Sequence, residues 1–68
     1  MPYQANSDLP PPIRLHLDRH AQDIYREAFN HAWTQYQGDA RREEIAHRVA
    51  WAAVKKQYVK SGTMWVHK

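Results

Sequence analysis

The sequence predicts a mostly α fold: a compact three-helix domain with a short helix at about residues 10–17 and long helices at about 19–37 and 40–60. Three observations predict it. A proline-containing, turn-rich segment opens the chain, an amphipathic stretch follows it, and a second apolar stretch begins after Gly38-Asp39. With 68 residues, we expect a single domain, 1–68, that buries about 60% of the surface its unfolded chain exposes.

The short helix at about 10–17 rests on the run Pro10-Pro11-Pro12. The first turn of a helix tolerates proline, because its backbone N–H groups have no partner inside the helix. Ile13, Leu15 and Leu17 would supply its apolar contacts. Consecutive prolines also suit an extended segment, which stays open as an alternative.

The helix at about 19–37 has the clearest pattern in the chain. Its apolar residues recur in steps of three and four, which places them on one stripe. Asp18 is a suitable N-cap, and Gly38 suits the left-handed residue that ends a helix. The stripe consists of Ala21, Ile24, Tyr25, Ala28, Phe29, Ala32, Trp33 and Tyr36.

The helix at about 40–60 has Asp39 as its candidate cap, and Ser61-Gly62 would end it. Its apolar residues cover most of the circumference, so we expect it to be the central element, enclosed by neighbours on several sides. The core residues predicted from both long helices are Ile24, Tyr25, Phe29, Trp33, Tyr36, Ile45, Val49 and Ala53.

The last residues, 63–68, have the composition of a strand but little length. A short antiparallel pairing of this segment with the N-terminal Pro2-Tyr3-Gln4 would let Trp65 and Tyr3 cover the open end of the core.

Composition excludes several classes of protein. The chain has no cysteine, so disulfides and thiolate metal sites are excluded. No apolar run approaches the roughly 18 residues of a membrane span, and the N-terminus lacks the features of a signal peptide. We therefore expect a cytoplasmic protein whose relation to a membrane, if it has one, is peripheral. The net charge of +3 leans toward nucleic acid, anionic lipid or an acidic protein face.

Residues with catalytic or metal-binding chemistry form no recognisable site. His16 and His20 have the four-residue spacing of a ligand pair, but a helix boundary is predicted between them, so local hydrogen bonding is the favoured interpretation. Glu43 and Glu44 project about 100° apart and suit the first turn of a helix instead of an acid/base pair. We expect no enzyme activity, no catalytic or metal residues, no cofactor and no small-molecule substrate.

The basic residues are the candidate interaction surface: Arg41, Arg42, Arg48, Lys55 and Lys60. A solvated polar strip is the alternative, because mixed charge is ordinary on small domains. Trp51 projects away from Ile45 and Val49, and it either packs against the first helix or joins an exposed patch; packing is favoured.

Three stretches together resemble the ChaB family of small bacterial proteins, which are described as cation transport regulators. They are Met1-Pro2-Tyr3 with Asp8-Leu9-Pro10; His20-Ala21-Gln22-Asp23-Ile24-Tyr25, continuing to Ala32-Trp33; and Arg42-Glu43-Glu44, leading to Ala46-His47-Arg48-Val49-Ala50-Trp51. The match spans nearly the whole chain. Two departures are the short connection from Gln37 to Ala40 and a tail without the acidic, polar residues of some members.

The resemblance implies a compact helical domain and a regulator of a Na⁺ or Ca²⁺/proton antiporter that contacts this membrane protein peripherally. It offers no catalytic or metal-binding residues to carry over. Viral relatives have been discussed as DNA-binding, so the alternative is a small basic nucleic-acid-binding module that uses Arg41, Arg42, Arg48 and Lys55. A structural module within an oligomer is a third hypothesis.

Overall fold

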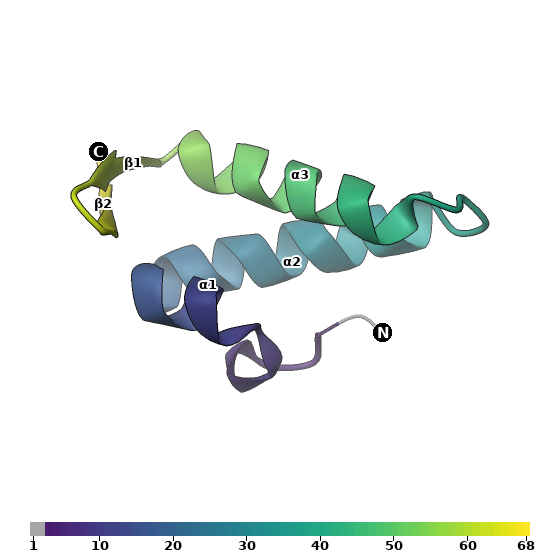
Figure 1. Ribbon diagram of the computed structural model, residues 1–68, viewed down its shortest axis with the longest axis horizontal. Helices are drawn as coiled ribbons and strands as arrows, with labels where there is room; N and C mark the ends of the chain where they lie inside the picture. Colours follow the sequence, from purple (N-terminus) through teal and green to yellow (C-terminus); the bar gives the residue numbers. More distant parts are fainter. Residues whose placement is uncertain (1–2) are drawn as a thin grey trace.

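Two antiparallel helices, α2 (Arg19–Gln35) and α3 (Arg42–Lys55), form the body of the protein in a computed structural model that describes residues 3–68 (Figure 1). A 3₁₀ turn, η1 (Asn6–Asp8), and the short helix α1 (Pro11–His16) precede them. The strands β1 (Tyr58–Ser61) and β2 (Met64–His67) follow α3. The mostly α fold with a short antiparallel pairing is therefore confirmed, and α1 lies within its predicted range. Pro11 and Pro12 stand in its first turn, not in an extended segment.

Helix α2 begins and buries its apolar stripe as its sequence predicts. Asp18 is the N-cap, and its Oδ1 accepts a hydrogen bond of 2.9 Å from the backbone N–H of Ala21. The helix ends at Gln35, two residues before the predicted end, and Gly38 takes a left-handed φ of +96° in the turn that follows. Its fully buried residues are Ala21, Tyr25, Phe29 and Ala32.

Helix α3 is not the enclosed central element that its composition suggests. It buries only one face against α2, made of Ala46, Ala50 and Val54, while Ala52 is exposed. Helix α2 is the central element instead, because α3 lies along one side of it and the N-terminal segment along another (Figure 1). Small alanines on the contact face allow two helices to approach closely, which explains why this face is the buried one.

The start of α3 also differs from expectation. Its N-cap is Arg41, not Asp39. Asp39 instead stabilises the turn before the helix, where its Oδ1 accepts a 2.8 Å hydrogen bond from the backbone N–H of Arg41.

A β-hairpin replaces the last turn of the predicted helix 40–60. Helix α3 stops at Lys55, and Tyr58, Val59, Lys60 and Ser61 pair with His67, Val66, Trp65 and Met64 in that order. Gly62 does not end a helix. It is the first residue of a two-residue hairpin turn, where its φ of +62° is a conformation that glycine adopts without steric cost.

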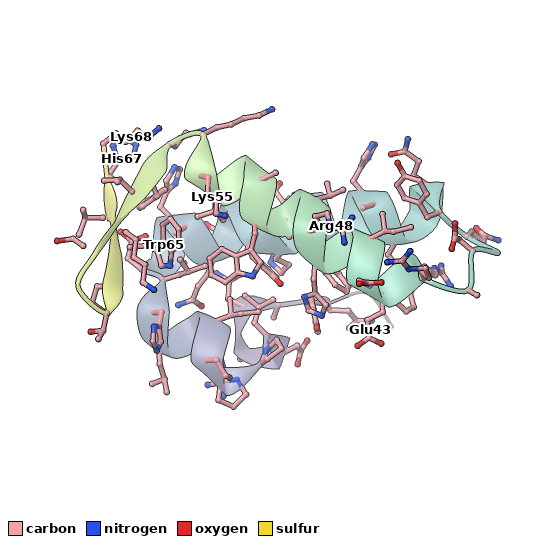
Figure 2. The ribbon with its side chains drawn as sticks, turned by 45° about the horizontal axis from the view of Figure 1, so that its top comes forward. Glu43, Arg48, Lys55, Trp65, His67 and Lys68 are labelled. Atoms are coloured by element: carbon pink, nitrogen blue, oxygen red, sulfur yellow. The ribbon has the colours of Figure 1, made fainter. Side chains whose placement is uncertain are left out.

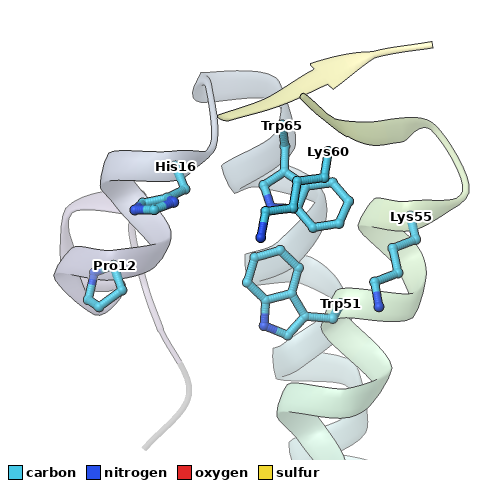
Figure 3. A pocket seen from close by; sticks show the side chains of 6 residues that line it. All are labelled: Pro12, His16, Trp51, Lys55, Lys60 and Trp65. Atoms are coloured by element: carbon cyan, nitrogen blue, oxygen red, sulfur yellow. The ribbon is translucent and has the colours of Figure 1, made fainter. Parts of the chain in front are cut away.

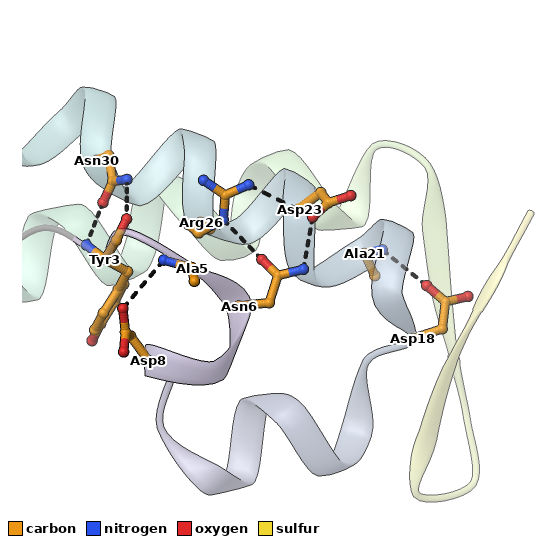
Figure 4. Close-up of polar contacts among 9 residues, drawn as sticks. All are labelled: Tyr3, Ala5, Asn6, Asp8, Asp18, Ala21, Asp23, Arg26 and Asn30. Carbon is orange, nitrogen blue, oxygen red and sulfur yellow. Dashed lines mark hydrogen bonds and ion pairs between the residues drawn. The ribbon is translucent and has the colours of Figure 1, made fainter.

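The N-terminal segment packs on α2 and does not pair with the tail. Asn30 clamps the backbone of Tyr3: its Oδ1 accepts from the Tyr3 N–H at 2.8 Å, and its Nδ2 donates to the Tyr3 carbonyl at 2.6 Å (Figure 4). The predicted strand partner of residues 63–68 is therefore wrong for Tyr3, while Pro2 lies outside the described residues. The ring of Tyr3 still covers the core, with its centroid 4.7 Å from that of Phe29.

A polar bridge holds η1 against the same helix. The Nδ2 of Asn6 donates to Asp23 Oδ1 at 2.7 Å, and the Nε of Arg26 donates to Asn6 Oδ1 at 2.8 Å (Figure 4). The hydrogen bond from Asn6 lowers the pKa of the Asp23 carboxyl. These hydrogen bonds to α2 fix the position of η1, and with it the position of α1, which follows η1 in the chain.

The core lies between α2, α3 and the N-terminal segment. Leu9, Ile13 and Leu17 enter it from the segment around α1, and Tyr58 enters it from β1. Of the eight predicted core residues, Tyr25 and Phe29 are fully buried. The other six are half-buried at its edges: Ile24, Trp33, Tyr36, Ile45, Val49 and Ala53.

Candidate functional site

An open cleft of about 390 Å³ lies where α1, α3 and the hairpin come together (Figure 3). We call it the tryptophan–lysine cleft. The hairpin follows α3 directly along the chain, but α2 separates α1 from both, so the cleft exists only in the folded chain. It is lined by Pro12 and His16 from α1, Trp51 and Lys55 from α3, Lys60 from β1 and Trp65 from β2.

Two indole rings form the floor of this cleft. The rings of Trp51 and Trp65 have centroids 5.4 Å apart and are tilted by 38°. Trp51 is fixed from behind by Tyr25, whose ring meets it edge-on at 5.3 Å. Trp51 therefore combines the two roles that its sequence left open, because it packs against the core and also lines a surface that a partner can reach.

Two ammonium groups flank the indoles. Lys55 follows Trp51 by one turn of α3, and Lys60 is the cross-strand partner of Trp65. Lys60 and Trp65 share the inner face of the hairpin, because paired residues in a sheet point to the same side. No lining residue carries a carboxylate. The cleft thus suits an anionic group attached to an apolar or aromatic one, which would meet cations and indole faces together.

The distribution of charge along the chain points to the same end of the molecule. All seven aspartates and glutamates lie at or before Glu44, whereas five of the ten lysines and arginines lie after it. This segregation is visible in the sequence, and it is the signal that could have directed attention to the tail. Trp65, which we expected only to cover the open end of the core, is the residue that this signal would have added.

The structure divides the predicted interaction surface into two parts. Lys55 and Lys60 line the tryptophan–lysine cleft. Arg41 and Arg48 instead share the carboxylate of Glu44, at 2.8 Å and 3.7 Å. The hydrogen bond from Arg41 is the main cause that lowers the pKa of Glu44.

Arg42, the fifth predicted residue, lies against α2. Its guanidinium stands 4.0 Å from the centre of the Trp33 ring, and its Nε donates a 2.7 Å hydrogen bond to the Trp33 carbonyl. Arg42 therefore has a structural role that stabilises the junction of α2 and α3.

The histidines do not converge. His16 ends α1 and faces the cleft, whereas His20 belongs to α2 and lies near Tyr58 and His67, with the two imidazole centroids 6.2 Å apart. The hydroxyl of Tyr25 and Nδ1 of His47 share a hydrogen bond that is partly buried. Among residues 3–68, no group of three potential metal ligands forms a site.

None of the helices in the described part of the chain combines the length and the apolar character that a bilayer crossing requires.

Comparisons with known proteins agree on one family. The ChaB family model matches residues 9–68. A protein of Escherichia coli (strain K12) named "Putative cation transport regulator ChaB" is 54% identical over an alignment that covers all of this chain and 97% of the relative. A protein of the same name from Shigella flexneri has the same identity and coverage. An NMR solution structure of a protein with that name superposes with a TM-score of 0.88 at 53% identity, covering 98% of this chain and 99% of the other.

Proposed function

Because the chain belongs to the ChaB family, we propose that it regulates cation transport without catalysis, by docking on an antiporter that exchanges Na⁺ or Ca²⁺ for protons. The names of its relatives support the regulatory role. The antiporter and the mode of contact are our inference. In this proposal the protein is cytoplasmic and becomes peripheral at the inner membrane when it binds.

The tryptophan–lysine cleft is the observation that carries the proposed contact. An acidic segment on the cytoplasmic face of the antiporter would place a carboxylate against Lys55 and Lys60 and an adjacent apolar side chain against Trp51 and Trp65. Tryptophan is among the residues that contribute most to protein interfaces, because it buries a large rigid surface. The two lysines add attraction and orientation, which raise the rate and the specificity of docking.

Co-purification tests this function. The tagged chain is recovered from membranes of its own cells, and the proteins that accompany it are identified. We expect a cation/proton antiporter with the wild type and a loss of at least tenfold with the double variant Lys55→Gln, Lys60→Gln.

The matched control is the double variant Arg41→Gln, Arg48→Gln, which removes the same charge from residues already paired with Glu44. It should recover the antiporter almost as well as the wild type. Recovery of no cation transporter by the wild type, or an equal loss in both double variants, contradicts the proposal.

Nucleic acid is the second candidate, and the absence of any aspartate or glutamate after Glu44 favours it. Against it, Arg41 and Arg48 pair with Glu44 and Arg42 packs on Trp33. Three of its four proposed phosphate contacts are therefore engaged within the protein. A salt titration of binding to duplex DNA tests whether the chain binds nucleic acid. Phosphate neutralisation requires affinity to fall steeply as salt rises, and no measurable binding at low salt dismisses this function.

A further inference from the structure

The outer face of the β1–β2 hairpin carries three of the four exposed large hydrophobic residues found among residues 3–68. Alternation along the strands puts Tyr58, Lys60 and Trp65 on the inner side, so Val59, Met64 and Val66 point outward. These three side chains are 48%, 42% and 43% exposed, and only one other large hydrophobic residue among 3–68, Leu15, is exposed. Val59 and Val66 are direct cross-strand partners, so the apolar atoms form one continuous patch.

Two lysines lie at the open end of the hairpin that carries this patch, and neither strand has a carboxylate side chain. Lys56 immediately precedes the hairpin and Lys68 immediately follows it, and both are exposed. The Lys68 N–H donates a 2.9 Å hydrogen bond to the Gln57 carbonyl, which holds these two lysines at the same end of the ribbon. Figure 2 shows His67 and Lys68 together at the open end of the hairpin, and the strand register places this end beside the residues that join α3 to β1.

We propose that this outer face rests on the surface of a bilayer containing anionic phospholipids, with Val59, Met64 and Val66 in the headgroup region and Lys56 and Lys68 among the lipid phosphates. The inference goes beyond docking on an antiporter and uses a different face from the tryptophan–lysine cleft. Short apolar surfaces with basic neighbours bind such interfaces by adding apolar burial to electrostatic attraction.

Charge and shape select a lipid surface over the other occupants of this face. A second copy of the chain would present this same face, whose strands carry no carboxylate side chain, so it would offer Lys56 and Lys68 no opposite charge. A protein partner needs a matching contour, whereas this ribbon projects at one end of the molecule (Figure 1). A fluid bilayer adapts to a projecting ribbon.

Flotation with protein-free vesicles tests the proposal. Vesicles of equal parts phosphatidylglycerol and phosphatidylcholine are compared with vesicles of phosphatidylcholine alone, at low and at physiological salt. We expect the wild type to float with the anionic vesicles only and to release as salt rises. Lys56→Gln and Lys68→Gln should each weaken binding about fivefold, since one lysine near such a surface contributes about 1 kcal/mol.

The matched control for charge is Arg41→Gln, because it removes one cation from the opposite end of α3. The apolar contribution is tested with the double variant Val59→Ser, Val66→Ser, which should weaken binding roughly tenfold. Its control is Leu15→Ser on α1, which should leave binding unchanged. If the double valine variant fails to fold by circular dichroism, Met64→Ser takes its place, because that exposed side chain next to the turn can be removed singly.

Three results would overturn the inference. They are no flotation of the wild type with anionic vesicles at low salt, equal losses in the hairpin variants and their controls, and a wild-type dimer in sedimentation that the valine variant abolishes. The last result would assign the patch to a second copy. Because the vesicles contain no protein, failure here leaves the antiporter proposal standing, and failure of co-purification leaves this one standing.

Discussion

The phenol of Tyr58 donates a hydrogen bond to Oδ1 of Asp18 at 3.1 Å, across forty positions of the sequence. The same oxygen accepts the backbone N–H of Ala21 and so caps helix α2. One carboxylate therefore joins the first turn of α2 to the hairpin that forms a wall of the tryptophan–lysine cleft. Asp18, whose side chain caps the first turn of α2, therefore also helps to position the hairpin.

Replacing Tyr58 by phenylalanine tests this link. The variant keeps the buried ring and loses only the donor, so we expect the free energy of unfolding to fall by about 1.5–3 kcal/mol, as for a hydrogen bond to a charged group. Chemical denaturation measures the change. In a chain that already carries Asp18→Ala, the same substitution should have little further effect, and additive losses would show that the two residues are not coupled.

Alkaline pH should destabilise the protein. Burial, together with the hydrogen bond to Asp18, raises the pKa of Tyr58 above its ordinary value of 10.0, and burial raises the pKa of Tyr25 as well. The unfolded chain loses these protons near pH 10 while the folded chain retains them. Stability is therefore fully present below pH 10 and is lost as pH rises toward the folded-state pKa values of the two tyrosines.

Denaturation midpoints measured across pH 8–12 would reveal this loss. Tyr58→Phe should flatten the decline, because it removes one of the groups that produce it. A decline as steep in that variant as in the wild type would show that Tyr58 ionises normally in the folded protein.

A larger side chain in the contact between α2 and α3 should destabilise the protein. Ala50 is fully buried between them, and Ala50→Val would overpack the contact and lower the free energy of unfolding by about 1–3 kcal/mol. Ala52→Val is the control, because Ala52 is exposed in the same helix. Its replacement should cost only the small difference in helix propensity between alanine and valine. Thermal or chemical denaturation compares them, and equal losses would contradict the close approach of the helices.

The pKa of Glu44 should depend on Arg41. The hydrogen bond and the charge of Arg41 hold it below its ordinary value of 4.5. In Arg41→Gln, an NMR titration of the Glu44 side chain should give a midpoint closer to 4.5. An unchanged midpoint would assign the effect to Arg48, the weaker partner at 3.7 Å.

Local patterns were enough to predict the elements whose cause is local. Asp18 caps α2 because a carboxylate can reach the free N–H groups of the first turn, and this needs no tertiary contact. The step of three and four from Ala21 to Ala32 selects one face of α2, so Tyr25 and Phe29 were recognised as core residues from spacing alone.

Other features were decided by contacts between distant residues. Helix α3 is apolar on most sides, so its pattern could not choose a face, and packing against α2 chose the alanine face because alanines permit the closest approach. Tyr58 follows Val54 by four residues, a spacing that fits a longer helix, but pairing with His67 and the bond to Asp18 hold it in a strand. The cleft assembles from α1, α3 and the hairpin, and periodicity, which reports one element at a time, carries no information about how separate elements meet.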